Sequence, residues 1–178
     1  MNTNKKIVIT GGPGTGKTSV IDFLKNEGYQ CLLEISRQVT LEARADGIEQ
    51  LFLTDPLLFS KKLLEGRMQQ HRQSEALTGT VFFDRGVPDV LAYMDYSGDS
   101  YPEYFEEACQ KHRYDRVFLL PPWEDIYTSD NERYENFAQA REIHKFLEQA
   151  YLRAGYDLQE VPTGTVEERA HFILKNIH

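Results

Sequence analysis

Short apolar runs alternate with longer amphipathic stretches along the chain. Runs rich in β-branched and aromatic residues that stop at glycine, proline or a charged residue predict buried strands. These strands are expected at residues 5–10, 29–34, 80–84, 114–120 and 156–162. The stretches between them have helical spacing and helix-ending residues, and predict helices at 17–28, 35–47, 54–77, 88–96, 102–112, 131–155 and 165–176. The alternation predicts an α/β fold, in which helices cover both faces of a mostly parallel sheet.

Composition narrows the class of protein. The 178 residues fit a single domain spanning 1–178, and the net charge of −8 disfavours nucleic acid and anionic membranes as partners. Cys31 and Cys109 have no metal-type or redox-type spacing, which is typical of reduced thiols in a cytoplasmic protein. The N-terminus has no signal-peptide pattern. We therefore expect a cytoplasmic monomer or homodimer with small-molecule ligands.

The strongest chemical signal is the stretch GGPGTGKT at residues 11–18, between a predicted strand and a predicted helix. It matches the P-loop pattern, in which glycines let backbone N–H groups surround phosphates. Lys17 is expected to reach the β- and γ-phosphates, and Thr18 to bind Mg²⁺. ATP or GTP is the predicted ligand. The predicted nucleotide-binding residues are Gly12, Pro13, Gly14, Thr15, Gly16, Lys17, Thr18 and Ser19.

Charged residues follow the second and third predicted strands, where ligands of such sheets bind. Asp84 is a candidate for Mg²⁺ binding or for general base, or else a turn cap. Arg85 is a candidate for contacting phosphate or substrate, or else forms a surface ion pair. Glu34 is a candidate for accepting sugar hydroxyls or for general base, or else a helix-terminal acid. Arg37 lies one turn later and shares its face.

The segment after the fourth predicted strand is polar and aromatic. A lid there would bring Arg133 to the phosphates, whereas a solvated helix start would leave Asp130 as a cap. Trp123 and Tyr127 are interpreted mainly as packing groups, and the turn at 161–165 could border the nucleobase.

The helix predicted at 54–77 carries Arg67 and Arg72. Both could project toward an acceptor, but the helical pattern favours a solvated face.

Taken together, these motifs resemble a known family. GGPGTGKT, LLEISR, FFDRGVPDVLAY, VFLLPPWE, DNERYE and VPTGTVEER are similar to the small AAA-labelled P-loop ATPase domain family. That family is related to the nicotinamide riboside kinase domain of the bacterial NAD-biosynthesis regulator, and more distantly to deoxynucleoside and thymidylate kinases. The resemblance covers about residues 5–175.

The resemblance implies a three-layer αβα fold with sheet order 2-3-1-4-5. It also implies Lys17 and Thr18 for phosphate and Mg²⁺, Asp84 for Mg²⁺ or base, Glu34 and Asp89 facing the acceptor, and Arg133 as lid arginine. The chain departs from the riboside kinases at residues 34–37 and 129–133, where those relatives look more like E-Y/W-x-R and D-D-G-x-R.

Two functions remain open from the sequence. The first is a Mg²⁺-dependent phosphotransferase that moves the γ-phosphoryl group of ATP to a small hydroxyl acceptor such as a nucleoside or riboside. The second is a nucleotide-dependent switch or slow NTPase that acts through a partner. The sequence does not choose between ATP and GTP, or between Glu34 and Asp84 as base.

Overall fold

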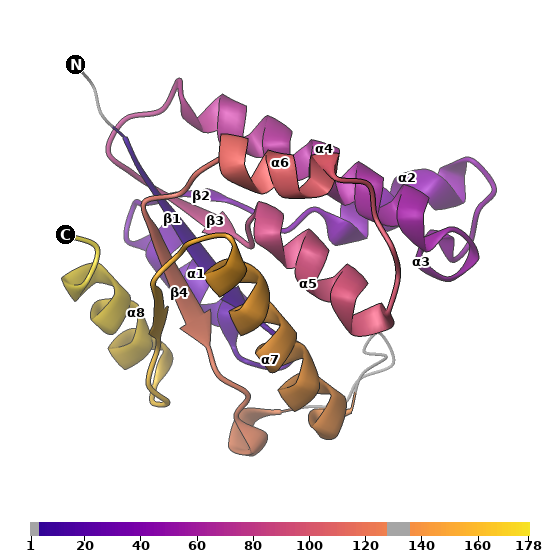
Figure 1. The fold of residues 1–178 in the computed structure, drawn as a ribbon. Helices are drawn as coiled ribbons and strands as arrows, with labels where there is room; N and C mark the ends of the chain where they lie inside the picture. The colour runs from indigo at the N-terminus through magenta and orange to yellow at the C-terminus, as the bar shows by residue number, and fades with distance from the viewer. Residues whose placement is uncertain (1–3, 128–135) are drawn as a thin grey trace.

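A five-stranded parallel sheet forms the centre of the computed structural model, which describes residues 4–127 and 136–178 (Figure 1). The strand order is β2-β3-β1-β4-β5, which confirms the order implied by the family resemblance. The strand bounds are β1 (Lys5–Gly11), β2 (Gln30–Leu32), β3 (Thr80–Asp84), β4 (Arg116–Leu120) and β5 (Leu158–Glu160). Because all five run parallel, their carboxyl ends meet at one edge, which is where the predicted chemical groups lie.

Side chains alternate between the two faces of the central strand. Ile7 and Ile9 are fully buried with α1 (Lys17–Asn26) and α8 (Val166–Lys175) on one face. Val8 is buried on the opposite face, among residues of the four helices α4–α7. Both faces of the sheet are therefore covered, as the predicted three-layer αβα fold requires.

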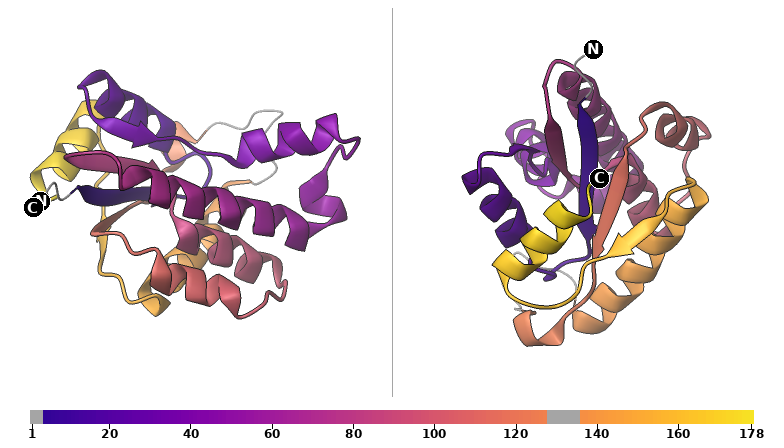
Figure 2. Two further views of the ribbon diagram at one scale, coloured as in Figure 1. Left: turned by 90° about the horizontal axis from the view of Figure 1, so that it is seen from above. Right: turned by 90° about the vertical axis from the view of Figure 1, so that its left-hand side faces the viewer.

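Four helices cover the second face, and the first and last of them begin at a capping side chain. The four are α4 (Pro56–Ser74), α5 (Val87–Ser97), α6 (Tyr104–Lys111) and α7 (Phe137–Arg153). Asp55 caps α4 by accepting a hydrogen bond from Leu58 N at 3.0 Å, and Pro56 occupies the first turn. Asn136 caps α7 by accepting a hydrogen bond from Gln139 N at 2.9 Å. Two further helices, α2 (Ser36–Ala45) and α3 (Leu51–Thr54), extend the molecule beyond the sheet (Figure 2).

Several predicted bounds need correction. The edge strands β2 and β5 each pair with one neighbour only, and both are shorter than predicted. After β2, the Leu33 carbonyl accepts from the Gln70 side chain at 2.7 Å, so a side chain takes the place of a ladder partner. The sequence missed the separate helix α3 and a 3₁₀ turn at Glu124–Ile126. Of the helix predicted at 131–155, residues 131–135 lie outside the described part of the chain.

Within residues 4–127 and 136–178, no helix has the length and apolar character needed to cross a membrane.

Candidate functional site

The glycine-rich loop connects β1 to α1 at the carboxyl edge of the sheet. Gly14 and Gly16 have φ values of 72° and 79°, in the left-handed region that favours glycine. A Cβ on Gly11 would lie 2.9 Å from the Leu120 carbonyl oxygen, so the close approach to β4 also requires glycine. All eight predicted nucleotide-binding residues, 12–19, line one cavity of about 730 Å³. The loop therefore has an open space beside it that is large enough for a small ligand.

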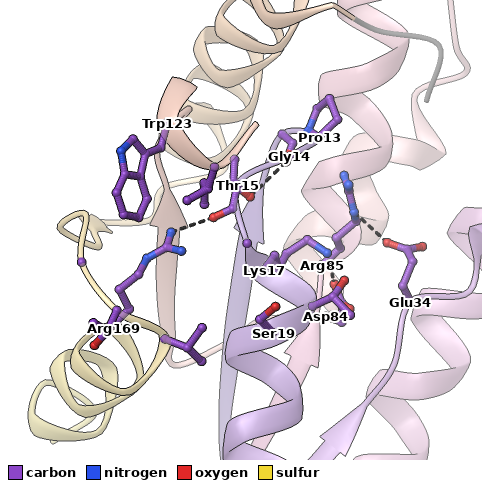
Figure 3. Close-up of a pocket in the computed structure, with 17 residues that line it drawn as sticks. Pro13, Gly14, Thr15, Lys17, Ser19, Glu34, Asp84, Arg85, Trp123 and Arg169 are labelled. Carbon is purple, nitrogen blue, oxygen red and sulfur yellow. Dashed lines mark hydrogen bonds and ion pairs between the residues drawn. The ribbon is translucent and has the colours of Figure 1, made fainter. Parts of the chain in front are cut away.

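Lys17 and Asp84 face each other in this cavity (Figure 3). Lys17 is only 8% exposed, and its Nζ forms an ion pair and hydrogen bond with Asp84 Oδ1. Burial lowers the pKa of Lys17, and the nearby Arg85 lowers it further, while the Asp84 carboxylate raises it. The structure therefore brings together the cation and the carboxylate that the sequence assigned to phosphate and Mg²⁺.

Glu34 connects the end of β2 to two arginines. Its Oε1 accepts hydrogen bonds from Arg67 Nη2 at 3.0 Å and from the backbone amides of Ile35 and Ser36, both at 2.9 Å. Its Oε2 lies 2.7 Å from Arg85 Nε in an ion pair. The N–H of Arg85 does not point toward this oxygen, so Glu34 Oε2 and Arg85 Nε have no hydrogen-bond partner among the described residues.

The charge of Glu34 follows from these contacts. Burial alone would raise its pKa, but Arg67, Arg85 and Lys17, together with the Ser36 amide, hold the pKa well below its ordinary range. Glu34 is therefore a carboxylate that accepts hydrogen bonds easily and takes up a proton with difficulty.

Arg67 corrects the interpretation of its helix as a solvated face. It is 3% exposed, and besides Glu34 its Nη1 contacts the Asp84 carbonyl oxygen at 3.4 Å. Arg72, in contrast, is exposed as predicted.

Arg85 enters the cavity through an unusual backbone conformation. Among the described residues it is the only non-glycine with a positive φ, at 73°. Such a conformation costs about 1 kcal/mol or more and is kept only where the surroundings hold it. Arg85 Nη1 donates to Tyr93 Oη at 3.0 Å, and its guanidinium lies 5.2 Å from the centre of the Tyr93 ring. The turn thus directs Arg85 toward Glu34.

Asp89 does not line the cavity, although the family resemblance places it opposite the acceptor. It is 2% exposed and accepts hydrogen bonds from Thr10 Oγ1, Tyr151 Oη and, at 2.8 Å, Gly86 N. Its Oδ1 lies 3.8 Å from Arg85 Nη1. Asp89 therefore lies behind Arg85, in contact with the strand that leads into the glycine-rich loop.

Two more predicted site residues lie away from the cavity or outside the described chain. Arg37 is exposed on α2 and does not line the cavity. Arg133 lies outside the described residues, as does the rest of the predicted lid at 128–135.

The Mg²⁺ ligands predicted from sequence are Thr18 and Asp84. Both line the cavity beside the loop, and a hydroxyl and a carboxylate oxygen are ligands that suit Mg²⁺. No group of three or more His, Cys, Asp or Glu side chains that could hold a metal occurs in the described part of the chain. The donor set therefore fits a Mg²⁺ ion that keeps water and nucleotide phosphates as its other ligands.

The far end of the cavity contains Arg169, which the sequence analysis did not single out. Arg169, on α8, is 2% exposed and lines the cavity together with Trp123 and Ile126. Figure 3 shows Trp123 and Arg169 on one side of the loop and Asp84, Arg85 and Glu34 on the other. The predicted turn at 161–165 does reach this end, through Gly164 and Thr165. Arg169 lies one helical turn after Thr165, and that spacing was the available signal.

A family model for an AAA domain matches residues 6–169. The chain belongs to this family. The deoxyadenosine kinase from M. mycoides with dCMP and dCDP is similar in structure, with a TM-score of 0.72, 17% identity, and coverage of 97% of this chain and 98% of that one. The NadR protein in complex with NR is also similar, with a TM-score of 0.73, 16% identity, and coverage of 98% of this chain and 50% of that one. No curated protein sequence matches the chain.

At these identities the two structures show that the AAA-domain chain shares their fold. The family and the kinase-like fold predicted from the sequence are thus confirmed. The residue roles stay predictions.

Proposed function

We propose that this AAA-domain protein transfers the γ-phosphoryl group of ATP or GTP to the hydroxyl group of a small nucleoside-like acceptor, with Mg²⁺ as cofactor. One observation carries the proposal: the glycine-rich loop and the Glu34–Arg85–Asp84 group line the same cavity of about 730 Å³. A protein that binds a nucleotide without transferring its phosphoryl group needs only the glycine-rich loop. A phosphotransferase also needs polar groups that hold an acceptor in line with the last phosphate.

On the donor side, residues 12–19 would bind the phosphates through backbone N–H groups, and Lys17 would contact the β- and γ-phosphates. Thr18 and Asp84 would hold Mg²⁺. The ion, when bound, neutralises charge that develops on the phosphates. Lys17 would then exchange its contact with Asp84 for one with phosphate.

On the acceptor side, Glu34 would accept a hydrogen bond from an acceptor hydroxyl, since this carboxylate lines the cavity. Arg85 would contact the transferring phosphoryl group. Asp84 is the better candidate for general base, because the arginines around Glu34 keep the pKa of that carboxyl low. We assign Asp89 to fixing Arg85 from behind, and we retain Arg133 as a proposed lid residue and Arg37 as a proposed acceptor contact.

The structural neighbours support an acceptor of this class. One is a deoxyadenosine kinase, whose structure contains dCMP and dCDP, and the other is NadR with NR. Both match the chain over nearly its full length.

The test measures ADP release from Mg²⁺-ATP, first alone and then with a panel of nucleosides that includes nicotinamide riboside and deoxyadenosine. One acceptor should stimulate ADP release strongly, and Asp84→Asn should remove the stimulation while the protein stays folded. Slow turnover that no acceptor changes would refute the phosphotransferase and favour the nucleotide-dependent switch.

A further inference from the structure

Arg169 is a buried cation that has no counter-charge among the residues that the structure describes. It is 2% exposed and among the largest fully buried side chains of the described chain. Its Nη2 donates to the Thr15 carbonyl oxygen at 2.8 Å, and its Nε has no hydrogen-bond partner. No acidic group of the described residues forms an ion pair with it. Within residues 4–127 and 136–178, its hydrogen-bond partner is thus one neutral carbonyl.

This arrangement is unusual for a buried arginine. Burying a charge is costly unless another charge or several hydrogen bonds compensate for it. On the other side of the loop, the buried Arg67 and the partly buried Arg85 both contact the Glu34 carboxylate. Burial lowers the pKa of Arg169, and no neighbouring carboxylate opposes the shift. The described residues therefore leave the charge of Arg169 available for an anionic ligand.

The position of Arg169 indicates which ligand. Its side chain lies on the glycine-rich loop itself, since a Cβ on Gly16 would be 2.7 Å from Arg169 Nη1. It also lines the cavity that the loop borders. Backbone N–H groups of such a loop bind phosphate, so an anionic phosphate oxygen is the group expected beside it.

We propose that Arg169 binds a phosphate group of the nucleotide held by the glycine-rich loop. It makes the site selective for charged nucleotides over uncharged nucleosides, and it provides a contact additional to Lys17. The inference rests on the nucleotide site of the proposed function, but not on phosphoryl transfer. Its alternative is a purely structural role, in which Arg169 only braces the Thr15 carbonyl.

The experiment compares the binding of ADP and of inorganic tripolyphosphate to the wild type, Arg169→Gln and Arg169→Lys. Trp123 is the single tryptophan of the chain and lies 5.8 Å from the Arg169 guanidinium, so its fluorescence provides the readout beside calorimetry. Lys175→Gln is the matched control, because it removes one exposed positive charge from the same helix outside the cavity. Thermal unfolding of each free protein is measured in parallel.

Arg169→Gln should weaken both ligands by about tenfold or more, which is typical for the loss of a charge-assisted hydrogen bond. Arg169→Lys should stay within about threefold of the wild type, and Lys175→Gln should change neither affinity. The free Arg169→Gln protein should unfold at the wild-type temperature or higher, because an uncompensated buried charge has been removed.

Three results would overturn the proposal. If Arg169→Gln loses affinity for ADP but not for tripolyphosphate, Arg169 contacts the nucleoside part. If it keeps both affinities and unfolds at a lower temperature, Arg169 only braces the loop. If the wild type binds neither ligand, the nucleotide site and the proposed function fail together. ADP binding without acceptor-stimulated turnover, in contrast, refutes phosphoryl transfer alone.

If Arg169→Gln does not fold, nuclear magnetic resonance of the arginine Nε–H groups decides on the wild-type protein, with Arg169→Lys used for assignment. The Arg169 signal should shift when tripolyphosphate is added, and an unchanged signal at saturation would overturn the proposal.

Discussion

Replacing Glu34 with glutamine tests whether its carboxylate stabilises the folded protein by pairing with Arg67 and Arg85. Glutamine keeps the shape of the side chain but removes the negative charge. Arg67, with a side chain only 3% exposed, then loses an ionic partner at 3.0 Å, and Arg85 loses one at 2.7 Å. Breaking a fully buried ion pair costs about 3–5 kcal/mol. The Glu34 side chain is 23% exposed, so water compensates in part, and we expect about 2 kcal/mol.

For a domain of this size, that loss lowers the unfolding temperature by about 4–8 °C. Calorimetry or circular dichroism measures the change. The matched control is Glu142→Gln, because Glu142 pairs with Lys145 at 2.7 Å on the surface, with both side chains more than half exposed. That substitution should leave the unfolding temperature nearly unchanged.

A double-mutant cycle with Arg67→Met checks the cause. If the cost of Glu34→Gln comes from an unpaired buried guanidinium, the double variant should be more stable than the sum of the single changes predicts, by about 1–2 kcal/mol. Additive effects, or a Glu34→Gln protein as stable as the wild type, would refute the reasoning. ADP release is measured on the same proteins, and acceptor stimulation should be lost in Glu34→Gln while nucleotide binding remains.

Three other changes have direct structural consequences. The stability advantage of the wild type over Glu34→Gln should persist from about pH 8 to pH 5 and shrink below pH 4.5. The reason is that the pKa of Glu34 in the folded protein lies below this ordinary value, so its stabilising charge is lost as the pH falls toward the folded-state pKa. Denaturant titrations at several pH values measure the difference, and a difference that vanishes near pH 6 would contradict the prediction. Gly16→Ala should weaken ADP binding more than tenfold, because the φ of Gly16 is 79° and the new Cβ would lie 2.7 Å from Arg169 Nη1. Titration calorimetry measures the affinity, and unchanged binding would mean that the loop tolerates a side chain at this position. Tyr151→Phe removes a hydrogen-bond donor to the buried Asp89 and should lower the free energy of unfolding by about 1–2 kcal/mol, measured in a denaturant titration. An unchanged stability would indicate that the hydrogen bonds from Thr10 and Gly86 are sufficient for the Asp89 carboxylate.

The fold could be predicted from the sequence because its signals are local. Apolar runs stopped by glycine or a charge located all five strands, and the glycine-rich pattern located the loop between β1 and α1. The bounds of the edge strands could not be predicted, since side-chain contacts such as Gln70 with the Leu33 carbonyl decide where pairing ends. Asp89 shows a similar limit. Its place after β3 suggested an acceptor contact, but Thr10 and Tyr151, which are distant in sequence, hold its carboxylate inside.

The burial of Arg67 and Arg169 could not be predicted from the helical pattern of the sequence. Arg67 and Arg169 occupy positions that a hydrophobic periodicity treats as polar, yet both are almost fully buried. Arg67 is buried because Glu34, from another part of the chain, lies opposite it. That pairing depends on how β2 and α4 meet in space, so no local spacing could reveal it.

The distribution of charge across the cavity connects these residues to the proposed reaction. On the proposed acceptor side, Arg67 and Arg85 already have carboxylate partners before any ligand binds, because Glu34 pairs with both and Asp89 lies 3.8 Å from Arg85. On the proposed donor side, no carboxylate of the described residues pairs with Arg169, and Lys17 Nζ contacts Oδ1, one of the two carboxylate oxygens of Asp84. Under the proposed function, phosphate groups would compensate Arg169 and attract Lys17 away from Asp84. Asp84 would then be released from Lys17 when the nucleotide binds, so this arrangement would place nucleotide binding before the chemical step.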